Sequence, residues 1–157
     1  MGWLVILHAR MQHAFRIRLA VEEDAAAIAR LSETFGYKAA VEATRERLNT
    51  ILRLPSELMI VAEDANERIV GWLQAHASHV IESGFRVEIA GLIVDPDSRR
   101  TGVGRLLVQE AERWARSLRA PAIVVRSNVK REESHAFYPA LGFATTKTQT
   151  VYRKNLG

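Results

Sequence analysis

The stretch V-D-P-D-S-R-R-T-G-V-G, residues 94–104, decides the fold of this chain, because it joins an apolar strand to an amphipathic helix. Residues 87–94, V-E-I-A-G-L-I-V, are nearly all apolar and rich in β-branched residues, which is typical of a strand buried on both faces. After the stretch, Leu107, Ala111 and Trp114 recur at helical spacing. The glycines therefore lie in a strand-to-helix turn, where backbone N–H groups and the helix dipole favour an anion.

Three kinds of phosphate-binding loop could use this turn. A P-loop needs Lys followed by Ser or Thr after its last glycine, but Arg105 and Leu106 follow Gly104. A dinucleotide-binding loop needs a third glycine and an acidic residue about twenty positions on, and neither is present. The remaining pattern, R-x-x-G-x-G over residues 99–104, resembles the coenzyme A pyrophosphate loop of the GNAT superfamily of N-acetyltransferases. The alternative is an ordinary glycine-rich turn.

A second stretch carries the same resemblance. Residues 124–143, V-V-R-S-N-V-K-R-E-E-S-H-A-F-Y-P-A-L-G-F, look like the GNAT strand that ends in Asn, followed by a helix with an aromatic pair. Asn128 precedes Tyr138 at the interval seen in that family, and Ser134 is a mild departure at a position that often holds a small residue. The resemblance extends from residue 15 to the C-terminus and is specific over residues 87–143.

The resemblance implies a fold and a cosubstrate. We expect one α/β (α+β) domain over residues 15–157, with a mixed central sheet in the order β-α-α-β-β-β-α-β-α-β. Its central strands, residues 87–94 and 122–125, are expected to splay apart. Acetyl-CoA is the implied cosubstrate, with the pantetheine arm pairing along one splayed strand. The implied coenzyme A contacts are Leu92, Ile93, Val94, Arg99, Arg100, Thr101, Gly102, Val103, Gly104, Arg105, Asn128 and Tyr138.

Periodicity and turn residues predict the other elements. Alternation predicts a strand over residues 15–19, and the acidic residues 22–24 should begin a helix that Gly36 ends. A second helix should run until Pro55. Further predicted elements are strands at 59–62, 69–75 and 122–125, a helix from about 103 to 118, a short helix at 134–141, and a final strand or hairpin at 145–153.

Residues 1–14 read as an N-terminal extension. Residues 3–7 are apolar but shorter than a signal sequence core, and no basic residue precedes them. Met11 is an alternative start. The segment could also add an edge strand, in this chain or across a homodimer.

Composition excludes several classes of protein. A chain of 157 residues, 48% of them hydrophobic, is expected to form one folded domain, and the absence of cysteine excludes disulfides, thiolate metal sites and a cysteine acyl-enzyme. No apolar run is long enough to span a membrane, so we expect no membrane partner and a cytoplasmic location. The net charge is +4, but basic residues are scattered among acidic ones, and no nucleic-acid partner is expected.

Acetyl transfer to an amine needs a base, because a lysine-like amine is mostly protonated at neutral pH. Glu88 is the candidate, as the only charged side chain in the strand at 87–94, and related acetyltransferases use a glutamate there. Alternatively, Glu88 starts the strand at solvent. Backbone N–H groups near Leu92 and Ile93 are expected to stabilise the negative charge on the attacked carbonyl oxygen.

The departing thiolate needs a proton, and the resemblance assigns this role to Tyr138. With reference pKa values of about 10 and about 8.5, complete transfer is uphill by roughly 2 kcal/mol. Alternatively, Tyr138 only packs beside Phe137, and Asn128 only caps a turn. His76 and His79 are expected in a solvated loop, without a third ligand for a metal site; alternatively, they line an acceptor pocket.

The sequence thus predicts an acetyl-CoA-dependent N-acetyltransferase that transfers the acetyl group directly in a ternary complex. The alternatives are a non-catalytic acyl-CoA sensor of the same fold and a nucleotide-phosphate-binding protein. The expected acceptor is a small-molecule amine, first of all an aminoglycoside-like one, or otherwise a peptide or protein amine. No metal is expected.

Overall fold

The computed structural model describes residues 10–12, 14–128 and 130–157 of the chain. The chain divides into two compact units, Met1–Arg126 and Ser127–Gly157. Among the described residues, no helix is long and apolar enough to cross a bilayer.

The first unit is built on a mixed sheet whose strands lie side by side in chain order. The first five pair antiparallel, and the last runs parallel to its neighbour, as the predicted fold class requires. The strands are β1 (Arg10–Gln12), β2 (Phe15–Leu19), β3 (Glu57–Glu63), β4 (Ile69–Val80), β5 (Gly84–Val94) and β6 (Ile123–Val125).

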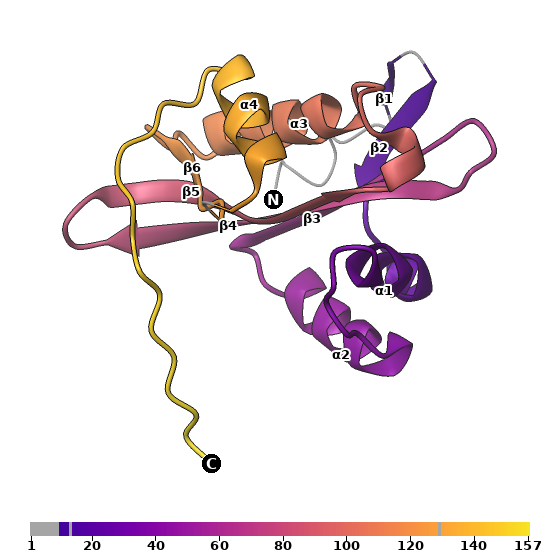
Figure 1. The fold of residues 1–157 in the computed structure, drawn as a ribbon, viewed down its shortest axis with the longest axis horizontal. Coiled ribbons are helices and arrows are strands. Elements are labelled where there is room, and N and C mark those ends of the chain that lie inside the picture. The colour runs from indigo at the N-terminus through magenta and orange to yellow at the C-terminus, as the bar shows by residue number, and fades with distance from the viewer. Residues whose placement is uncertain (1–9, 13, 129) are drawn as a thin grey trace. The chain divides into compact units, whose positions relative to one another are not determined.

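Helices cover both faces of this sheet. Figure 1 shows α1 (Ala25–Glu33) and α2 (Val41–Leu52) on one face and α3 (Val103–Ser117) on the other. Apolar side chains of α1 and α2 pack with Met59, Val61 and Ile93 of the sheet. On α3, the stripe predicted from its periodicity is buried, including Leu107 and Ala111. Burial of these stripes holds the layers together, since each buried Leu or Ile contributes about 1.5–3 kcal/mol.

Several element boundaries differ from prediction. The strands Glu57–Glu63 and Gly84–Val94 and the helix Glu132–Ala140 each begin two or three residues before their predicted starts. Two further differences have a clear physical reason. The acidic residues Glu22–Asp24 form a 3₁₀ turn before α1 rather than its first turn, because the buried Asp24 carboxylate accepts hydrogen bonds from Arg18 and from the Val21 N–H. Strand β4 continues to Val80 instead of ending near residue 75. Its extra residues, 76–80, pair with the N-terminal half of β5, so the predicted loop position of His76 and His79 is wrong.

The N-terminal extension contributes a strand. Residues Arg10–Gln12 form β1, which pairs antiparallel with β2 at the edge of the sheet. Residues 1–9 and 13 of the predicted extension lie outside the described residues.

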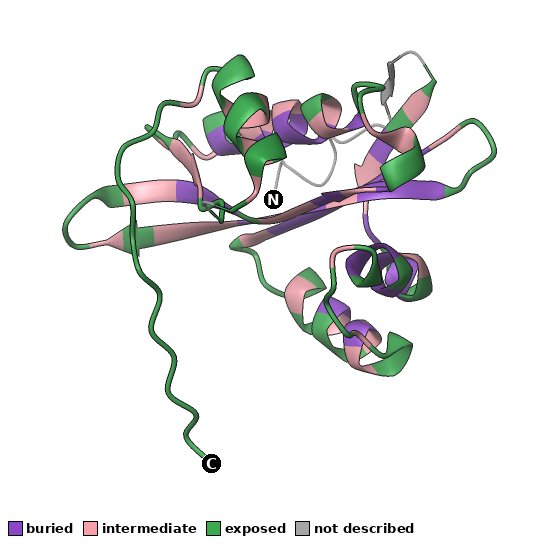
Figure 2. Cartoon of the chain, in the orientation of Figure 1, coloured by how far each residue is buried: buried purple, intermediate pink, exposed green. Residues whose placement is uncertain are grey.

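The second unit contains one described helix, α4 (Glu132–Ala140). Residues 144–157 are exposed and have no regular secondary structure (Figure 2), so the predicted strand or hairpin over 145–153 is wrong. The threonines there favour a strand, but the three large apolar side chains of residues 144–157, Val151, Tyr152 and Leu156, are all exposed. A high strand propensity does not produce a strand when the segment has no apolar face that packs against the rest of the protein.

Candidate active site

Strand β5 changes its pairing midway. It pairs with β4 along its whole length, but with β6 only at Val87, Glu88 and Ile89. Among the described residues, no strand pairs with β5 on the β6 side beyond Ile89. The predicted splay is therefore present, and it opens the backbone of residues 90–94, which include the predicted pantetheine contacts Leu92, Ile93 and Val94.

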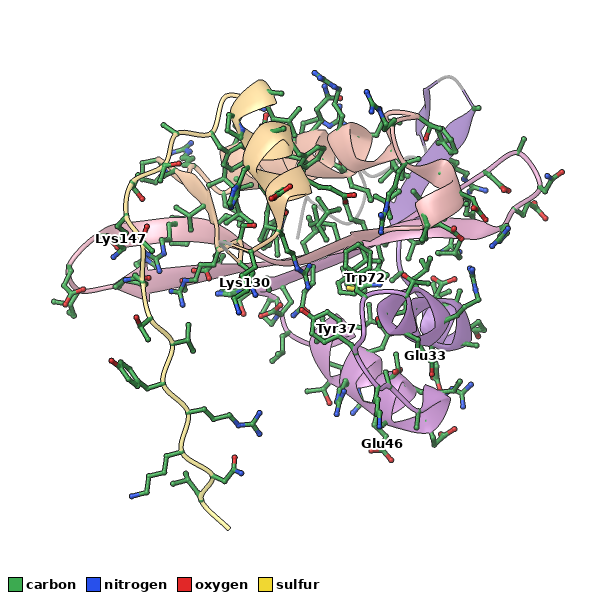
Figure 3. The ribbon with its side chains drawn as sticks, viewed as in Figure 1. Glu33, Tyr37, Glu46, Trp72, Lys130 and Lys147 are labelled. Atoms are coloured by element: carbon green, nitrogen blue, oxygen red, sulfur yellow. The ribbon has the colours of Figure 1, made fainter. Side chains whose placement is uncertain are left out.

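A bulge marks the start of this open segment. Ile89 pairs with Ala75 and Gly91 pairs with Gln74, so Ala90 is an extra residue without a partner on β4. Bulges bend a strand and redirect its side chains. A Cβ at Gly91 would lie 2.8 Å from the Trp72 ring, so this glycine lets the indole pack against the β5 backbone. Figure 3 shows Trp72 pointing from the sheet toward the α1 side.

The turn after β5 has the backbone that its glycine predicts. Gly102 precedes α3 with a φ of 95°, and Arg100 has a φ of 62°, both in the left-handed region. A Cβ on Gly102 would meet no described heavy atom within 4 Å, so the space beside the turn is open. Positive φ at a residue other than glycine costs free energy and tends to occur at functional sites.

The N-terminus of α3 is suited to an anion. Within the described residues, no side chain caps this terminus, so its first N–H groups point outward at the positive end of the helix dipole. Val103 is buried and can offer only its backbone, whereas Arg100, Thr101 and Arg105 are exposed. The guanidinium of Arg99 lies over the Phe35 ring, 5.1 Å from its centroid. This donor set fits the pyrophosphate of coenzyme A.

Asp95, which the sequence reading missed, anchors the turn. It is buried; its Oδ1 accepts the Asp97 N–H at 3.1 Å, and its Oδ2 accepts hydrogen bonds from Arg68 at 3.0 Å and Arg30 at 3.3 Å. The turn is thus tied to α1 and to the β3–β4 hairpin. The sequence does contain a pattern that predicts this role, since Asp followed by Pro after a strand is a common N-terminal cap.

Glu88 lies where β5 and β6 part. It is buried, which excludes the alternative that it starts the strand at solvent. One carboxylate oxygen is 3.1 Å from Arg126 Nε, and the other is 3.3 Å from an Arg86 Nη. Arg86 comes from β5 itself, whereas Arg126 directly follows the last residue of β6. Both oxygens of the candidate base are therefore engaged by guanidinium groups.

A polar row crosses the sheet at Glu88. Glu57, His76, Glu88 and Val124 are consecutive partners on β3, β4, β5 and β6. Directly opposed residues share a face and have Cβ atoms about 4.5–5.5 Å apart. His76 is therefore the nearest cross-strand neighbour of Glu88 on β4. His79 lies on the opposite face and stacks on Phe85, with ring centroids 4.7 Å apart.

In the second unit, Asn128 caps a turn. Its Oδ1 accepts the Lys130 N–H at 3.0 Å, and its carbonyl oxygen accepts the Arg131 N–H at 2.9 Å. The alternative interpretation of Asn128 is thus confirmed, and its contact with coenzyme A stays a prediction.

Tyr138 lies on α4 among aromatic rings. Its ring makes edge contacts with Phe137 and Phe143, with centroids 5.0 and 5.5 Å apart. Burial raises the pKa of Tyr138 to about 12, although the nearby Arg131 charge acts in the opposite direction. The Tyr138 hydroxyl is therefore a weaker acid than the reference pKa of about 10 suggested. It is suited to donating a hydrogen bond and less suited to giving its proton away completely.

Comparison with known proteins decides the family. The sequence profile of the acetyltransferase (GNAT) family matches residues 25–143. The chain belongs to the GNAT family. GNAT acetyltransferases use acetyl-CoA, so this chain is an acetyl-CoA-dependent N-acetyltransferase.

Two relatives and one solved structure are similar to this GNAT enzyme. The aminoglycoside N(6')-acetyltransferase type 1 of Acinetobacter genomosp. 13 is 26% identical over 120 residues, which cover 74% of this chain and 82% of the relative. The peptidyl-lysine N-acetyltransferase YjaB of Escherichia coli is 30% identical over 109 residues, which cover 68% of this chain and 65% of the relative. The structure of AAC(6')-Iy with the bisubstrate analogue CoA-S-monomethyl-acetylneamine has a TM-score of 0.80 at 21% identity and covers 92% of this chain and 99% of that one. This last likeness confirms the fold.

Gly102→Val tests the pyrophosphate turn of the GNAT enzyme. A left-handed conformation costs a residue with a Cβ roughly 1–2 kcal/mol, and the valine would occupy the open space where the phosphates are expected. We expect the acetyl-CoA Kd to rise about tenfold or more, measured by isothermal titration. Gly84→Val is the matched control, because Gly84 also has a positive φ, 75°, and open space around it. Equal acetyl-CoA affinity in the two folded variants would contradict the assignment.

Proposed function

We propose that this N-acetyltransferase transfers the acetyl group of acetyl-CoA directly to a small primary amine while both are bound. The proposal rests on one arrangement, in which the open segment of β5 leads into the uncapped N-terminus of α3 and Glu88 lies just before the bulge on the same strand. A thioester held along that segment would lie beside a carboxylate. The similarity to aminoglycoside and peptidyl-lysine acetyltransferases supports an amine acceptor.

In this proposal Glu88 accepts a proton from the acceptor ammonium group. The neutral nitrogen then attacks the acetyl carbonyl carbon, forming the C–N bond. Negative charge develops on the carbonyl oxygen, and backbone N–H groups at Leu92 or Ile93 would stabilise it, because fixed donors need no reorganisation. His76, opposite Glu88 on β4, is a second candidate base.

The C–S bond then breaks, and the departing thiolate takes a hydrogen bond or a proton from Tyr138. The acylated nitrogen loses its remaining extra proton to solvent, and solvent returns a proton to the Tyr138 oxygen if the tyrosine has given its own to the thiolate. Arg99, Arg100, Thr101, Gly102, Val103, Gly104 and Arg105 would hold the pyrophosphate, and Asn128 would contact the coenzyme through its side-chain amide.

Two measurements test the proposed function. Isothermal titration with acetyl-CoA, CoA and ATP should give the tightest binding for the coenzyme A compounds, and stronger ATP binding would support a nucleotide-phosphate-binding protein. A thiol-release assay with a panel of amines should then give turnover. Coenzyme A binding without turnover on any amine would support the acyl-CoA sensor.

A cytoplasmic location and a homodimer also stay proposals. Cell fractionation and light scattering of the full chain would test them.

A further inference from the structure

Glu88 has more positive charge beside it than one carboxylate neutralises. Two guanidinium groups, those of Arg86 and Arg126, flank a single carboxylate. The only other acidic residue in the polar row is Glu57, two strands away, and it accepts a hydrogen bond from Gln74 at 3.0 Å. Among the described residues, the cluster of Arg86, Arg126 and Glu88 therefore carries a net charge of +1.

The two arginines also have hydrogen-bond donors to spare. Each guanidinium carries five N–H donors. Arg86 uses one Nη for Ser83 at 3.2 Å and the other for Glu88, while its Nε is buried without a hydrogen-bond partner in the part of the chain that the structure describes. The side chain of Arg126 is 64% exposed, against 10% for Glu88, so a ligand can reach the Arg126 guanidinium directly.

Resting on the proposed function, we propose that Arg86 and Arg126 bind an anionic group, a carboxylate or a phosphonate, on the acceptor amine. The anionic group of the acceptor replaces the Glu88 carboxylate as the partner of the two guanidinium groups. The released Glu88 carboxylate accepts a proton from the acceptor ammonium group and passes it to solvent after acetyl transfer. The anion thereby provides both binding and activation of the base.

Geometry limits the acceptor. The amine must reach Glu88 while the anion reaches guanidinium groups that contact Glu88 before the acceptor binds. Because hydrogen bonds are about 2.9 Å long, about one to three carbon atoms separate the amine from the anionic group. A polycation would add like charge to a site with excess positive charge, which is unfavourable. The net charge of +4 acts in the same direction by attracting anionic acceptors over longer distances.

Acceptor preference is the first test, made with the full chain and acetyl-CoA. The anionic probes are β-alanine and 2-aminoethylphosphonate, the uncharged isostere is β-alaninamide, and the polycation is neamine. We expect kcat/KM for the anionic probes to exceed that for β-alaninamide by about 10- to 100-fold, as expected for charge-assisted hydrogen bonds. Equal values for acid and amide, or a preference for neamine, would overturn the proposal.

Arg126→Gln separates recognition from structure. This variant should lower kcat/KM for β-alanine about tenfold and raise it for β-alaninamide, because one Glu88 oxygen is then no longer engaged. An equal loss on both acceptors would mean that Arg126 is only structural. Arg116→Gln is the matched control, since Arg116 is also exposed and pairs with a glutamate, Glu112, at 3.0 Å on α3. It should leave both values unchanged.

A binding measurement distinguishes this proposal from the proposed function. With CoA present, β-alanine should bind the wild-type chain, and its Kd should rise about tenfold in Arg126→Gln, whether or not acetyl transfer occurs. Binding without acetylation would contradict the proposed function alone. Absence of binding by both anionic probes would overturn the anion site alone if other amines are acetylated.

Discussion

Replacing Tyr138 by Phe is expected to slow the acetyl-transfer step by about 10²–10⁴-fold, the usual contribution of a positioned acid. The substitution keeps the ring, and so keeps its edge contacts with Phe137 and Phe143. It removes only the hydroxyl that would serve the departing thiolate. The acetyl-CoA Kd and the melting temperature should therefore stay close to the wild-type values.

The measurement must resolve the chemical step, because product release can limit turnover. Single-turnover kinetics with preloaded acetyl-CoA does so. A single-turnover rate equal to that of the wild type would make Tyr138 a packing residue, and the thiolate would then leave by protonation from water.

The raised pKa of Tyr138 predicts the pH dependence of this effect. Since burial raises that pKa to about 12, the hydroxyl stays protonated throughout the ordinary assay range. Against a thiol pKa of about 8.5, complete proton transfer is uphill by about 5 kcal/mol, rather than the roughly 2 kcal/mol expected from reference values. We expect the ratio of wild-type to Tyr138→Phe single-turnover rates to stay constant from pH 7 to about 10. A ratio that falls toward one above about pH 9 would contradict a protonated donor.

Glu88→Gln should have an effect of similar size, about 10²–10⁴-fold on the same step. The amide nearly preserves the shape of the carboxylate, but its single oxygen can accept from only one of Arg86 and Arg126, and it cannot accept the amine proton. Single-turnover kinetics measures the loss, and thermal unfolding checks that the variant is folded, because a guanidinium deprived of its carboxylate destabilises the folded state.

Two further variants identify the base. Glu57→Gln is the matched control, since Glu57 lies in the same cross-sheet row but two strands away. It should keep nearly the full rate. His76→Gln tests the neighbour on β4. Loss of the chemical step in His76→Gln together with a wild-type rate in Glu88→Gln would assign the base to His76.

Local sequence determined the parts of the site that depend on neighbouring residues alone. The turn after β5 followed from Gly102 between an apolar strand and an amphipathic stripe, because glycine adopts the left-handed conformation found there at little cost. The buried stripe of α3 followed from its periodicity for the same reason. The aromatic pair Phe137–Tyr138 was also evident from the sequence, because the two residues are adjacent.

Tertiary structure alone decided the surroundings of Glu88 and of Asp95. Arg126, directly after the parallel strand β6, reaches Glu88, and His76 faces Glu88 from the antiparallel strand β4. Arg30 and Arg68 reach Asp95 from α1 and from the β3–β4 hairpin. These neighbours depend on strand register, and a slip of one residue would turn every side chain of a strand to the opposite face. Register is set by burial across the whole sheet, so the partners that define the charge of this site are not encoded in any short stretch of the chain.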